Sequence, residues 1–248
     1  MARTDNASAH QSAEYDVQIS ATIPYFAAFY QSTLDLIAAW GQPVTNWLDT
    51  GCGTGSLAVL ARSRFGQTEF ILADPATTML DKAREKMLGW PGVHFVQAGS
   101  QELTFADGSF DVITAIQCHH YLDKSGRLAA TKNCWRMLKT GGIYVEFENI
   151  RLRSSRGQAI GLAMWQNYQL ESGKTPTAAA EHIQRFDREY FPITILEHLD
   201  LLQSSGFDPV EILWVSYLQA GFYAIKSPLD GSINRPVLAA PAAGSALQ

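Results

Sequence analysis

The 248-residue sequence predicts an α/β fold with a mostly parallel sheet, helices on both faces and an antiparallel hairpin at its end. Short apolar runs alternate with stretches of helical period through most of the chain. Three glycines at alternate positions follow the first apolar run. Two late apolar runs, 210–216 and 221–226, are separated by so few residues that only antiparallel strands could be joined there.

Residues 13–226 are expected to form a single domain, preceded by a disordered N-terminus at 1–12 and followed by a flexible tail at 227–248. A hydrophobic content of 46% and a charged content of 17% are typical of a globular protein with a sizeable core. No apolar run has the length of a membrane span, and the N-terminus lacks the apolar core of a signal peptide. We therefore expect a cytoplasmic protein.

Residues 14–40 carry apolar side chains at helical spacing, and Pro24 divides them into two helices or one kinked helix. The next elements follow in alternation. Strands are expected at 44–48, 69–74, 93–98, 110–117 and 143–149, and helices at 56–64, 77–88, 125–138 and 193–205. Lys139 in a last helical turn, followed by Gly141, is an ordinary stop signal for the helix before the fifth strand.

Residues 151–192 interrupt the alternation with an aromatic insertion that is expected to form two helical pieces. Insertions after the carboxyl ends of strands usually lie over a binding site. We therefore expect residues 14–40 and 151–192 to close over that edge of the sheet as a helical cap and a lid. Such a chamber would admit a small molecule and exclude a folded polymer.

The first strand runs into a tight turn and then a helix, with the sequence Asp49-Thr50-Gly51-Cys52-Gly53-Thr54-Gly55. Glycine allows a ligand to approach the bare backbone, and a helix N-terminus presents free N–H groups to it. Cys52 is expected to be a small side chain beside the ligand. Asp49 could fix the turn or reach an amino group of the ligand, and it could equally cap the turn.

The second expected strand ends in Asp74, roughly 20 residues after the glycine turn. A carboxylate at that place is positioned to accept hydrogen bonds from ribose hydroxyls. The turn differs from the dinucleotide-binding pattern, because Ser56 stands where that pattern has its third glycine and Gly55 comes one residue earlier.

The pattern Asp49-x-Gly51-x-Gly53-x-Gly55 followed by Asp74 resembles the nucleotide-binding motifs of class I S-adenosylmethionine-dependent methyltransferases. The resemblance covers residues 40–226 as an order of elements. The segments Ala13-Glu14-Tyr15-Asp16 and Ile23-Pro24-Tyr25 also resemble the N-terminal helices of small-molecule members. The resemblance implies a Rossmann-like, seven-stranded fold, S-adenosyl-L-methionine as cofactor and in-line transfer of a methyl group to a small molecule.

The resemblance also implies a set of cofactor contacts around the glycine turn and the ends of the next strands. These are Asp49, Gly51, Cys52, Gly53, Gly55, Asp74, Pro75, Met79, Gly99, Ser100, Gln101 and Gln117. Members of the family often have an acidic residue after the third strand that accepts from the adenine amine. This chain has Ser100 there, so Ser100, Gln101 or the backbone is expected to replace it.

His119 and His120 follow the fourth strand, at the edge where ligands bind in open α/β folds. Adjacent extended residues point to opposite sides, so the pair is not expected to hold one metal. His119 is the candidate base or positioning group, and two structural histidines are the alternative. The candidate substrate contacts are Tyr15, Tyr25, His119, Glu148, Trp165 and Tyr190.

No metal is expected, because Cys52, Cys118 and Cys134 show no paired spacing. The formal net charge is −5 and basic runs are missing, so a nucleic-acid partner is not expected. A homodimer is compatible with the sequence. The sequence leaves three alternatives open: methylation of RNA or protein, a non-methylating reaction of the same cofactor, and a non-catalytic cofactor-binding module.

Overall fold

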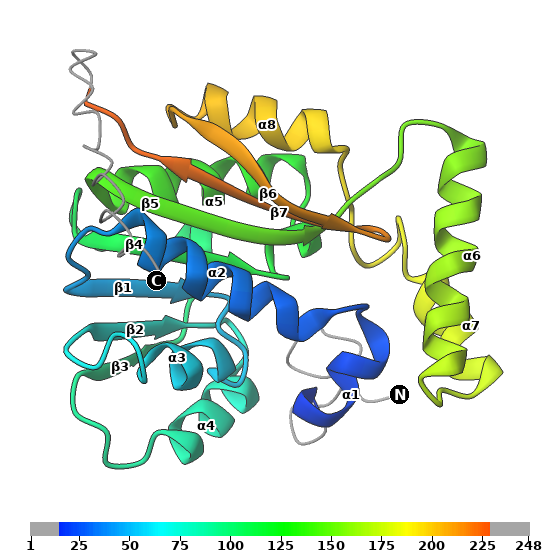
Figure 1. Ribbon diagram of the computed structural model, residues 1–248, viewed down its shortest axis with the longest axis horizontal. Coiled ribbons are helices and arrows are strands. Elements are labelled where there is room, and N and C mark those ends of the chain that lie inside the picture. Colours follow the sequence, from blue (N-terminus) through cyan, green and yellow to red (C-terminus); the bar gives the residue numbers. More distant parts are fainter. Residues whose placement is uncertain (1–14, 229–248) are drawn as a thin grey trace, which may run out of the picture.

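The computed structural model describes residues 15–228, which contain a seven-stranded sheet of order β3-β2-β1-β4-β5-β7-β6 (Figure 1). The strands are β1 (Asn46–Thr50), β2 (Glu69–Ala73), β3 (Val93–Val96), β4 (Phe110–Ile116), β5 (Leu138–Asn149), β6 (Val210–Ser216) and β7 (Gln219–Ile225). The first five are parallel, β7 is antiparallel to β5, and β6 is antiparallel to β7. This confirms the predicted fold class.

The helices alternate with the strands as predicted. They are α1 (Tyr15–Thr22), α2 (Phe26–Trp40), α3 (Ser56–Ala61), α4 (Thr77–Lys86), α5 (Lys124–Met137), α6 (Ser155–Glu171), α7 (Pro176–Gln184) and α8 (Ile195–Ser204), with short 3₁₀ turns η1 (Ser100–Glu102) and η2 (His119–Tyr121). Within residues 15–228, no helix has both the length and the apolar character to cross a membrane. The disorder predicted for 1–12 lies outside the described residues, as does the predicted tail beyond residue 228.

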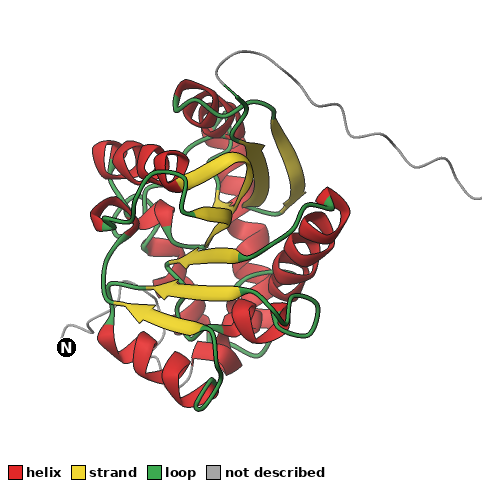
Figure 2. Ribbon diagram, turned by 90° about the vertical axis from the view of Figure 1, so that its left-hand side faces the viewer, coloured by secondary structure: helices red, strands yellow, loops and turns green. Residues whose placement is uncertain are grey.

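Helices cover both faces of the sheet (Figure 2). On one face α2, α3 and α4 pack on β1, β2 and β5, and the ring of Phe29 stacks on Phe147 with centroids 4.7 Å apart. On the other face, Cys134 and Met137 of α5 and Leu202 of α8 share a buried cluster with Leu48 and other strand residues. The core therefore holds the strand ends rigidly, and the loops at those ends carry the polar side chains described below.

The predicted start of the fifth strand was wrong. Leu138 already pairs with Phe110, so β5 begins directly after α5 and includes Lys139. The Lys139 ammonium donates to Asp111 Oδ1 at 2.7 Å, which ties the strand to β4. Gly141 has a φ of +80° inside this long strand, so the glycines shape an irregular strand and are not the stop signal of the preceding helix.

Helices α1, α6 and α7 lie beyond the carboxyl edge of the parallel strands (Figure 1). Two hydrogen bonds join α6 to α1 there. The Trp165 indole donates to the carbonyl of Thr22 at 2.7 Å, and the Tyr168 hydroxyl donates to the carbonyl of Ser20 at 2.7 Å. Helix α2 runs along the face of the sheet instead, so the N-terminal segment divides between the edge and the face.

Candidate active site

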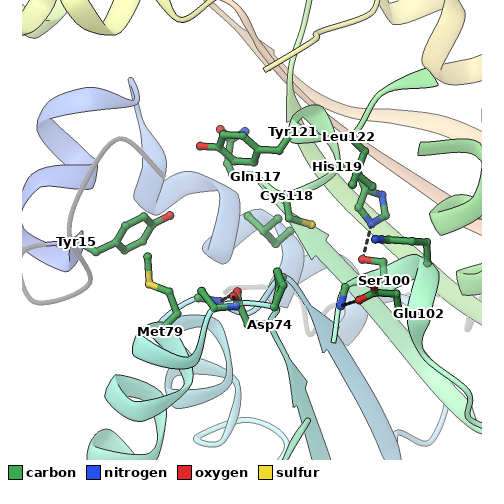
Figure 3. A pocket seen from close by; sticks show the side chains of 17 residues that line it. Tyr15, Asp74, Met79, Ser100, Glu102, Gln117, Cys118, His119, Tyr121 and Leu122 are labelled. Atoms are coloured by element: carbon green, nitrogen blue, oxygen red, sulfur yellow. Dashed lines mark hydrogen bonds between the residues drawn. The ribbon is translucent and has the colours of Figure 1, made fainter. Parts of the chain in front are cut away.

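A cavity of about 400 Å³ lies at the carboxyl ends of β1, β2, β3 and β4 (Figure 3). Its wall comes from five segments that are distant in the sequence. It is lined by Tyr15, Gly51, Gly53, Asp74, Pro75, Ala76, Met79, Gly99, Ser100, Gln101, Glu102, Ile116, Gln117, Cys118, His119, Tyr121 and Leu122. The volume is in the range of small-molecule and cofactor sites.

The glycine turn forms the floor of this cavity and needs glycine for two separate reasons. Gly51 has a φ of +65°, and a Cβ there would overlap the side chain of Cys118. Gly53 has a φ of +55°, and a Cβ there would have no atom within 4 Å, so this backbone opens onto the cavity. Residues other than glycine pay a steric cost in this left-handed region. The turn therefore exposes bare backbone to a ligand.

Asp74 is held at the floor by two backbone N–H groups. Its Oδ2 accepts from Gly53 at 2.9 Å and its Oδ1 accepts from Ala76 at 2.9 Å. The residue is 8% exposed. A carboxylate has about four acceptor positions, so a group anchored in this way can also accept from a ligand.

Asp49, Cys52 and Gly55 do not line the cavity. Asp49 is buried behind it and accepts from the Thr114 hydroxyl at 2.6 Å. Burial, with a smaller contribution from the negative charge of Asp74, raises the pKa of Asp49 to about 7 although the Thr114 hydrogen bond lowers it. The side chain of Cys52 is buried, and Gly55 lies against α4, where a Cβ would overlap Met87.

Gln101 lies across the position that a side chain at residue 99 would occupy. A Cβ built on Gly99 would be 2.9 Å from Gln101 Nε2 and 3.0 Å from Gln101 Oε1. The backbone N–H of Gly99 donates to Glu102 Oε2 at 2.9 Å, which fixes the turn after β3. The cavity wall at this end therefore carries a primary amide, which has both a donor and an acceptor.

His119 belongs to a chain of buried hydrogen bonds. Its Nε2 lies 2.8 Å from the Ser100 hydroxyl, and its Nδ1 lies 3.3 Å from the Tyr144 hydroxyl. Tyr144 donates to Glu146 Oε2 at 2.9 Å, and Glu146 Oε1 lies 2.9 Å from His198 Nδ1. Burial lowers the pKa of His119, so the ring is neutral at neutral pH.

The donor of each hydrogen bond in this series can be assigned by starting from Glu146. Because Tyr144 donates to Glu146, its oxygen must accept from Nδ1 of His119. A neutral ring protonated at Nδ1 has an acceptor at Nε2, so the Ser100 hydroxyl donates to it. The Thr50 hydroxyl, 2.7 Å away, then donates to Ser100. Both nitrogens of His119 are thus engaged by protein groups.

Helix α1 is fastened to the glycine turn by one carboxylate. Asp16 Oδ1 accepts from the hydroxyls of Thr54 at 2.6 Å and Ser56 at 3.0 Å. Its Oδ2 lies 2.5 Å from the ammonium of Lys86 at the end of α4. These contacts hold Tyr15, the preceding residue, over the cavity.

Of the six residues expected to contact substrate, Tyr15 and His119 line the cavity and the other four do not. Trp165 and Tyr190 are buried in the packing of α6 and α7, at 0% and 1% exposure. Tyr25 is 58% exposed and lies beside Trp214. The expectation that these side chains wall this cavity is corrected: Trp165 and Tyr190 pack among the helices, and Tyr25 packs against Trp214 of β6.

Glu148 is also displaced from the cavity, because it supports the turn after β4. Its Oε1 accepts from the backbone of His119 at 2.9 Å, and its Oε2 accepts from the backbone of His120 at 2.9 Å and contacts the His120 imidazole. Burial opposes ionisation, but the charge and hydrogen bond of His120 outweigh it and lower the pKa of Glu148 to about 2. The Glu148 carboxylate therefore fixes η2 and is not a pocket wall.

Several lining residues were not predicted. Tyr121 and Leu122 follow the histidine pair, and Cys118 precedes it, so their position after β4 was the available signal. Gln117 was predicted, and it adopts a left-handed φ of +57° with its backbone N–H donating to Phe147 at 2.6 Å. Such backbone strain in a non-glycine residue is common at functional sites.

The chain matches known proteins in the region that builds this cavity. A family described as "Methyltransferase domain" matches residues 48–142. The carboxy-S-adenosyl-L-methionine synthase of Campylobacter lari is 23% identical over 82% of this chain and 87% of that protein. The ubiquinone/menaquinone biosynthesis C-methyltransferase of Vibrio campbellii is 41% identical over 44% of this chain and 42% of that protein.

The chain belongs to the class I S-adenosylmethionine-dependent methyltransferase family. The fold agrees with human N-acetylserotonin methyltransferase in complex with S-adenosylmethionine, at a TM-score of 0.58 and 15% identity, over 88% of this chain and 59% of that one. The methyltransferase is thus an enzyme, and S-adenosyl-L-methionine is its cofactor.

The cavity of this methyltransferase fits that cofactor by the chemistry of its donors and acceptors. A ribose needs an acceptor, which Asp74 supplies from the floor. A purine edge needs a paired donor and acceptor, which the amide of Gln101 supplies. A charged amino-acid end needs exposed backbone, which Gly53 leaves open.

Proposed function

We propose that this methyltransferase moves the methyl group of S-adenosyl-L-methionine to a nucleophile on a small molecule. The observation that carries the proposal is the pairing of Asp74 with the glycine turn, 2.9 Å from the N–H of Gly53, in a cavity of cofactor size. The cofactor supplies the electrophilic methyl group. The protein positions the two reactants in line and keeps water away from them.

The cofactor contacts follow from the geometry of the cavity. The carboxylate of Asp74 would accept from the ribose hydroxyls, and Pro75 and Met79 would line the side of the nucleoside. The amino-acid end would lie along Gly51 and Gly53. Asp49, Cys52 and Gly55 would support this turn from behind, because none of them lines the cavity.

At the adenine end, we propose Gln101 as the group that reads the base. An adenine edge presents an amino donor beside a ring-nitrogen acceptor, which is the complement of an amide. The amide fills the side-chain space of Gly99, with Nε2 and Oε1 2.9 Å and 3.0 Å from a Cβ built there. Gly99 and Ser100 would only lie beside the base, since the Ser100 hydroxyl is already bonded to Thr50 and His119, and the Gly99 N–H to Glu102.

Tyr15 and Tyr121 are proposed to face the acceptor. Both line the cavity above Asp74, on the side of α1 and η2 (Figure 3). Burial raises the pKa of both hydroxyls above the usual value, so each stays a neutral donor at physiological pH. Neutral hydroxyls can orient an acceptor without adding a charge near the cationic sulfur.

For His119 we propose a positioning role in place of the general base that the sequence suggested. A base must have a free acceptor within reach of the proton that it removes. Here Nε2 accepts from Ser100 and Nδ1 donates to Tyr144. The ring therefore fixes the hydroxyl of Ser100 and, through it, the turn beside the adenine end.

A small-molecule acceptor is favoured over a nucleic acid by the net charge of −5 and by the volume of the cavity, about 400 Å³. A homodimer stays a prediction, which light scattering would test. Both curated relatives named above are named for reactions or pathways of small molecules.

A second candidate is a non-methylating reaction of the same cofactor. It is favoured by one observation: the carboxy-S-adenosyl-L-methionine synthases match over four fifths of this chain, whereas the C-methyltransferases match under half. In that reaction the methyl carbon of the cofactor would lose a proton and form a C–C bond to a carboxyl group released by a second substrate. The sulfur would keep its three bonds, and the cofactor would leave as carboxy-S-adenosyl-L-methionine.

Mass spectrometry of the reaction mixture separates the two candidates. The purified chain would be incubated with methyl-deuterated S-adenosyl-L-methionine, a pool of small hydroxylated, aminated and carbon-acid acceptors, and bicarbonate with a pool of small carboxylic acids as carboxyl donors. The proposal predicts S-adenosylhomocysteine together with an acceptor that carries the deuterated methyl group. Carboxylated cofactor with no S-adenosylhomocysteine would favour the second candidate, and failure to bind S-adenosylhomocysteine at all would contradict both.

A further inference from the structure

A second cavity, of about 800 Å³, lies next to the cofactor cavity, between α1 and the helices α6 and α7. It is lined by Val17, Gln18, Ala21, Ser172, Gly173, Lys174, Thr175, Ala178, Glu181, His182, Arg185 and Glu189. Tyr15, one turn or less away on α1, lines the cofactor cavity. The same short helix therefore forms part of both walls.

Lys174 is the distinctive side chain of this cavity. It follows the end of α6, where its backbone N–H donates to Gln169 at 3.0 Å, and its side chain is half-buried. Within residues 15–228, no carboxylate or carbonyl pairs with its ammonium group. A half-buried charge without a partner is costly, and it is a typical feature of a site whose partner is a ligand.

Arg185 adds a second positive charge to the same wall. Its Nε donates to Glu189 Oε2 at 2.6 Å, and its guanidinium lies 5.8 Å from the centroid of the Tyr190 ring. Burial, and then the charge of Arg185, lower the pKa of Lys174 to about 8. The two cations therefore repel each other in a partly desolvated place, and an anion between them would relieve that repulsion.

The two carboxylates that line the cavity do not neutralise the positive charge of Lys174. Glu189 already pairs with Arg185. Glu181 also lines the cavity, but among the described residues no ion pair joins its carboxylate to Lys174. The ammonium of Lys174 is unpaired, and the guanidinium of Arg185 beside it is already in an ion pair with Glu189. The net charge therefore suits an anion of a single charge, such as a carboxylate.

Arg185 also connects the two cavities. Tyr121 lines the cofactor cavity, and burial raises the pKa of its hydroxyl while the charge of Arg185 and a hydrogen bond with it act in the opposite direction. The guanidinium thus lies behind Tyr121, at the boundary. A molecule held at Lys174 would approach the side of the cofactor cavity that Tyr15 and Tyr121 form.

We propose that this second cavity binds the carboxylate of an anionic acceptor, with Lys174 as its ion-pair partner and Arg185 as a second positive charge. The proposal rests on the proposed function, because the acceptor is the molecule that must lie beside the methyl donor. It narrows the acceptor to organic acids that carry a single carboxylate distant from the methylated atom.

The test uses the full chain labelled with ¹³C at the lysine Cε atoms and two probes of the same shape, benzoate and benzamide. The NMR signal of Lys174 is assigned by its loss in Lys174→Gln. Benzoate, added up to roughly 50 mM, is expected to shift this signal saturably, whereas benzamide is not. Lys132, an exposed lysine of α5, serves as the control for non-specific charge effects. Arg185→Gln is expected to weaken benzoate binding about threefold to tenfold.

The outcomes separate this proposal from the proposed function when S-adenosylhomocysteine binding is measured by calorimetry on the same samples. A Lys174 signal that benzoate leaves unmoved, or that moves together with Lys132 or with benzamide, would overturn the carboxylate site. Normal S-adenosylhomocysteine binding in that case would leave the proposed function intact. Lys174→Arg should retain benzoate binding, because it keeps the charge.

Discussion

The Nε2 atom of His119 lies 2.8 Å from the hydroxyl of Ser100, and the ring is 1% exposed. The histidine was the natural candidate for a base, since it follows a strand at the ligand-binding edge. The chain of hydrogen bonds to Tyr144 and Glu146 gives it a different part in the site. These hydrogen bonds link the sheet to Ser100 in the turn after β3, where we propose that the adenine binds.

The first prediction concerns the kinetics of His119→Gln. A positioning role predicts weaker S-adenosylhomocysteine binding, by about threefold to tenfold, and an unchanged pH profile of kcat. A role as general base predicts the reverse. Cofactor affinity would be near normal, kcat would fall strongly, and the change of kcat with pH that titration of His119 causes would disappear. Calorimetry and steady-state kinetics on the same preparations distinguish the two roles.

The same residue predicts a pH dependence of stability. Burial lowers the pKa of His119 in the folded state from the ordinary value of 6.5. The unfolded chain therefore takes up a proton below about pH 6.5 that the folded chain does not, and stability falls as the pH drops through that value. Urea unfolding of His119→Gln should show a shallower loss between neutral and mildly acid pH.

Asp49 predicts the opposite dependence on pH. Its folded pKa is raised to about 7 from 3.8 by burial. Between these values the folded chain holds a proton that the unfolded chain has lost, so this group costs stability as the pH rises toward 7. Asp49→Asn should be more stable than wild type at neutral pH, by at most about 4 kcal/mol, and similar near pH 4. Urea unfolding at both pH values measures this. Equal stability at neutral pH would contradict it.

The contacts of Asp16 are expected to slow release of the cofactor by holding α1 over the cavity. Asp16→Asn loses the ion pair with Lys86 at 2.5 Å and weakens the bonds to Thr54 and Ser56. Because the side chain is 44% exposed, the effect should be modest: about 0.5 kcal/mol in stability and about threefold faster release of S-adenosylhomocysteine. Asp81→Asn, which breaks an exposed ion pair with Arg84 on α4, is the matched control. Stopped-flow fluorescence that shows equal release from both variants would sink the idea.

Independence from metal ions remains a prediction. Methyl transfer in line needs no Lewis acid unless an acceptor has to be oriented by one. Turnover is therefore expected to be unchanged after dialysis against a chelator. Loss of turnover that divalent ions restore would show that the acceptor is held by a metal.

The sequence alone predicted those parts of the cavity whose position a single local feature determines. The strand ending in Asp74 and the alternate glycines place the cofactor floor, because a short apolar strand and a tight turn leave few geometries. The positions of Trp165 and Tyr190 were not predictable in this way. Aromatic content reports that a side chain will be buried, and only the packing of α6 against α1 decides whether it faces a ligand or another helix.

The same limit explains His119 and Lys174. The proton arrangement around His119 depends on Tyr144, which comes from β5 and meets the histidine only through the parallel pairing of β4 and β5. No motif or spacing in the sequence distinguishes Lys174 from the other lysines. Lys174 lies in the turn between α6 and α7, and its proposed role depends on Arg185, which follows α7 and lines the same cavity.

The central claim is that Asp74 holds the ribose of the cofactor. Calorimetry would compare S-adenosylhomocysteine with its 2′-deoxy analogue, on the wild-type chain and on Asp74→Ala. Removing the hydroxyl should cost the wild type about tenfold or more in affinity, since a charge-assisted hydrogen bond contributes about 1.5–3 kcal/mol. The variant should bind both ligands equally and weakly. A variant that still prefers the hydroxylated ligand, or a wild type that shows no preference, would contradict the assignment of Asp74.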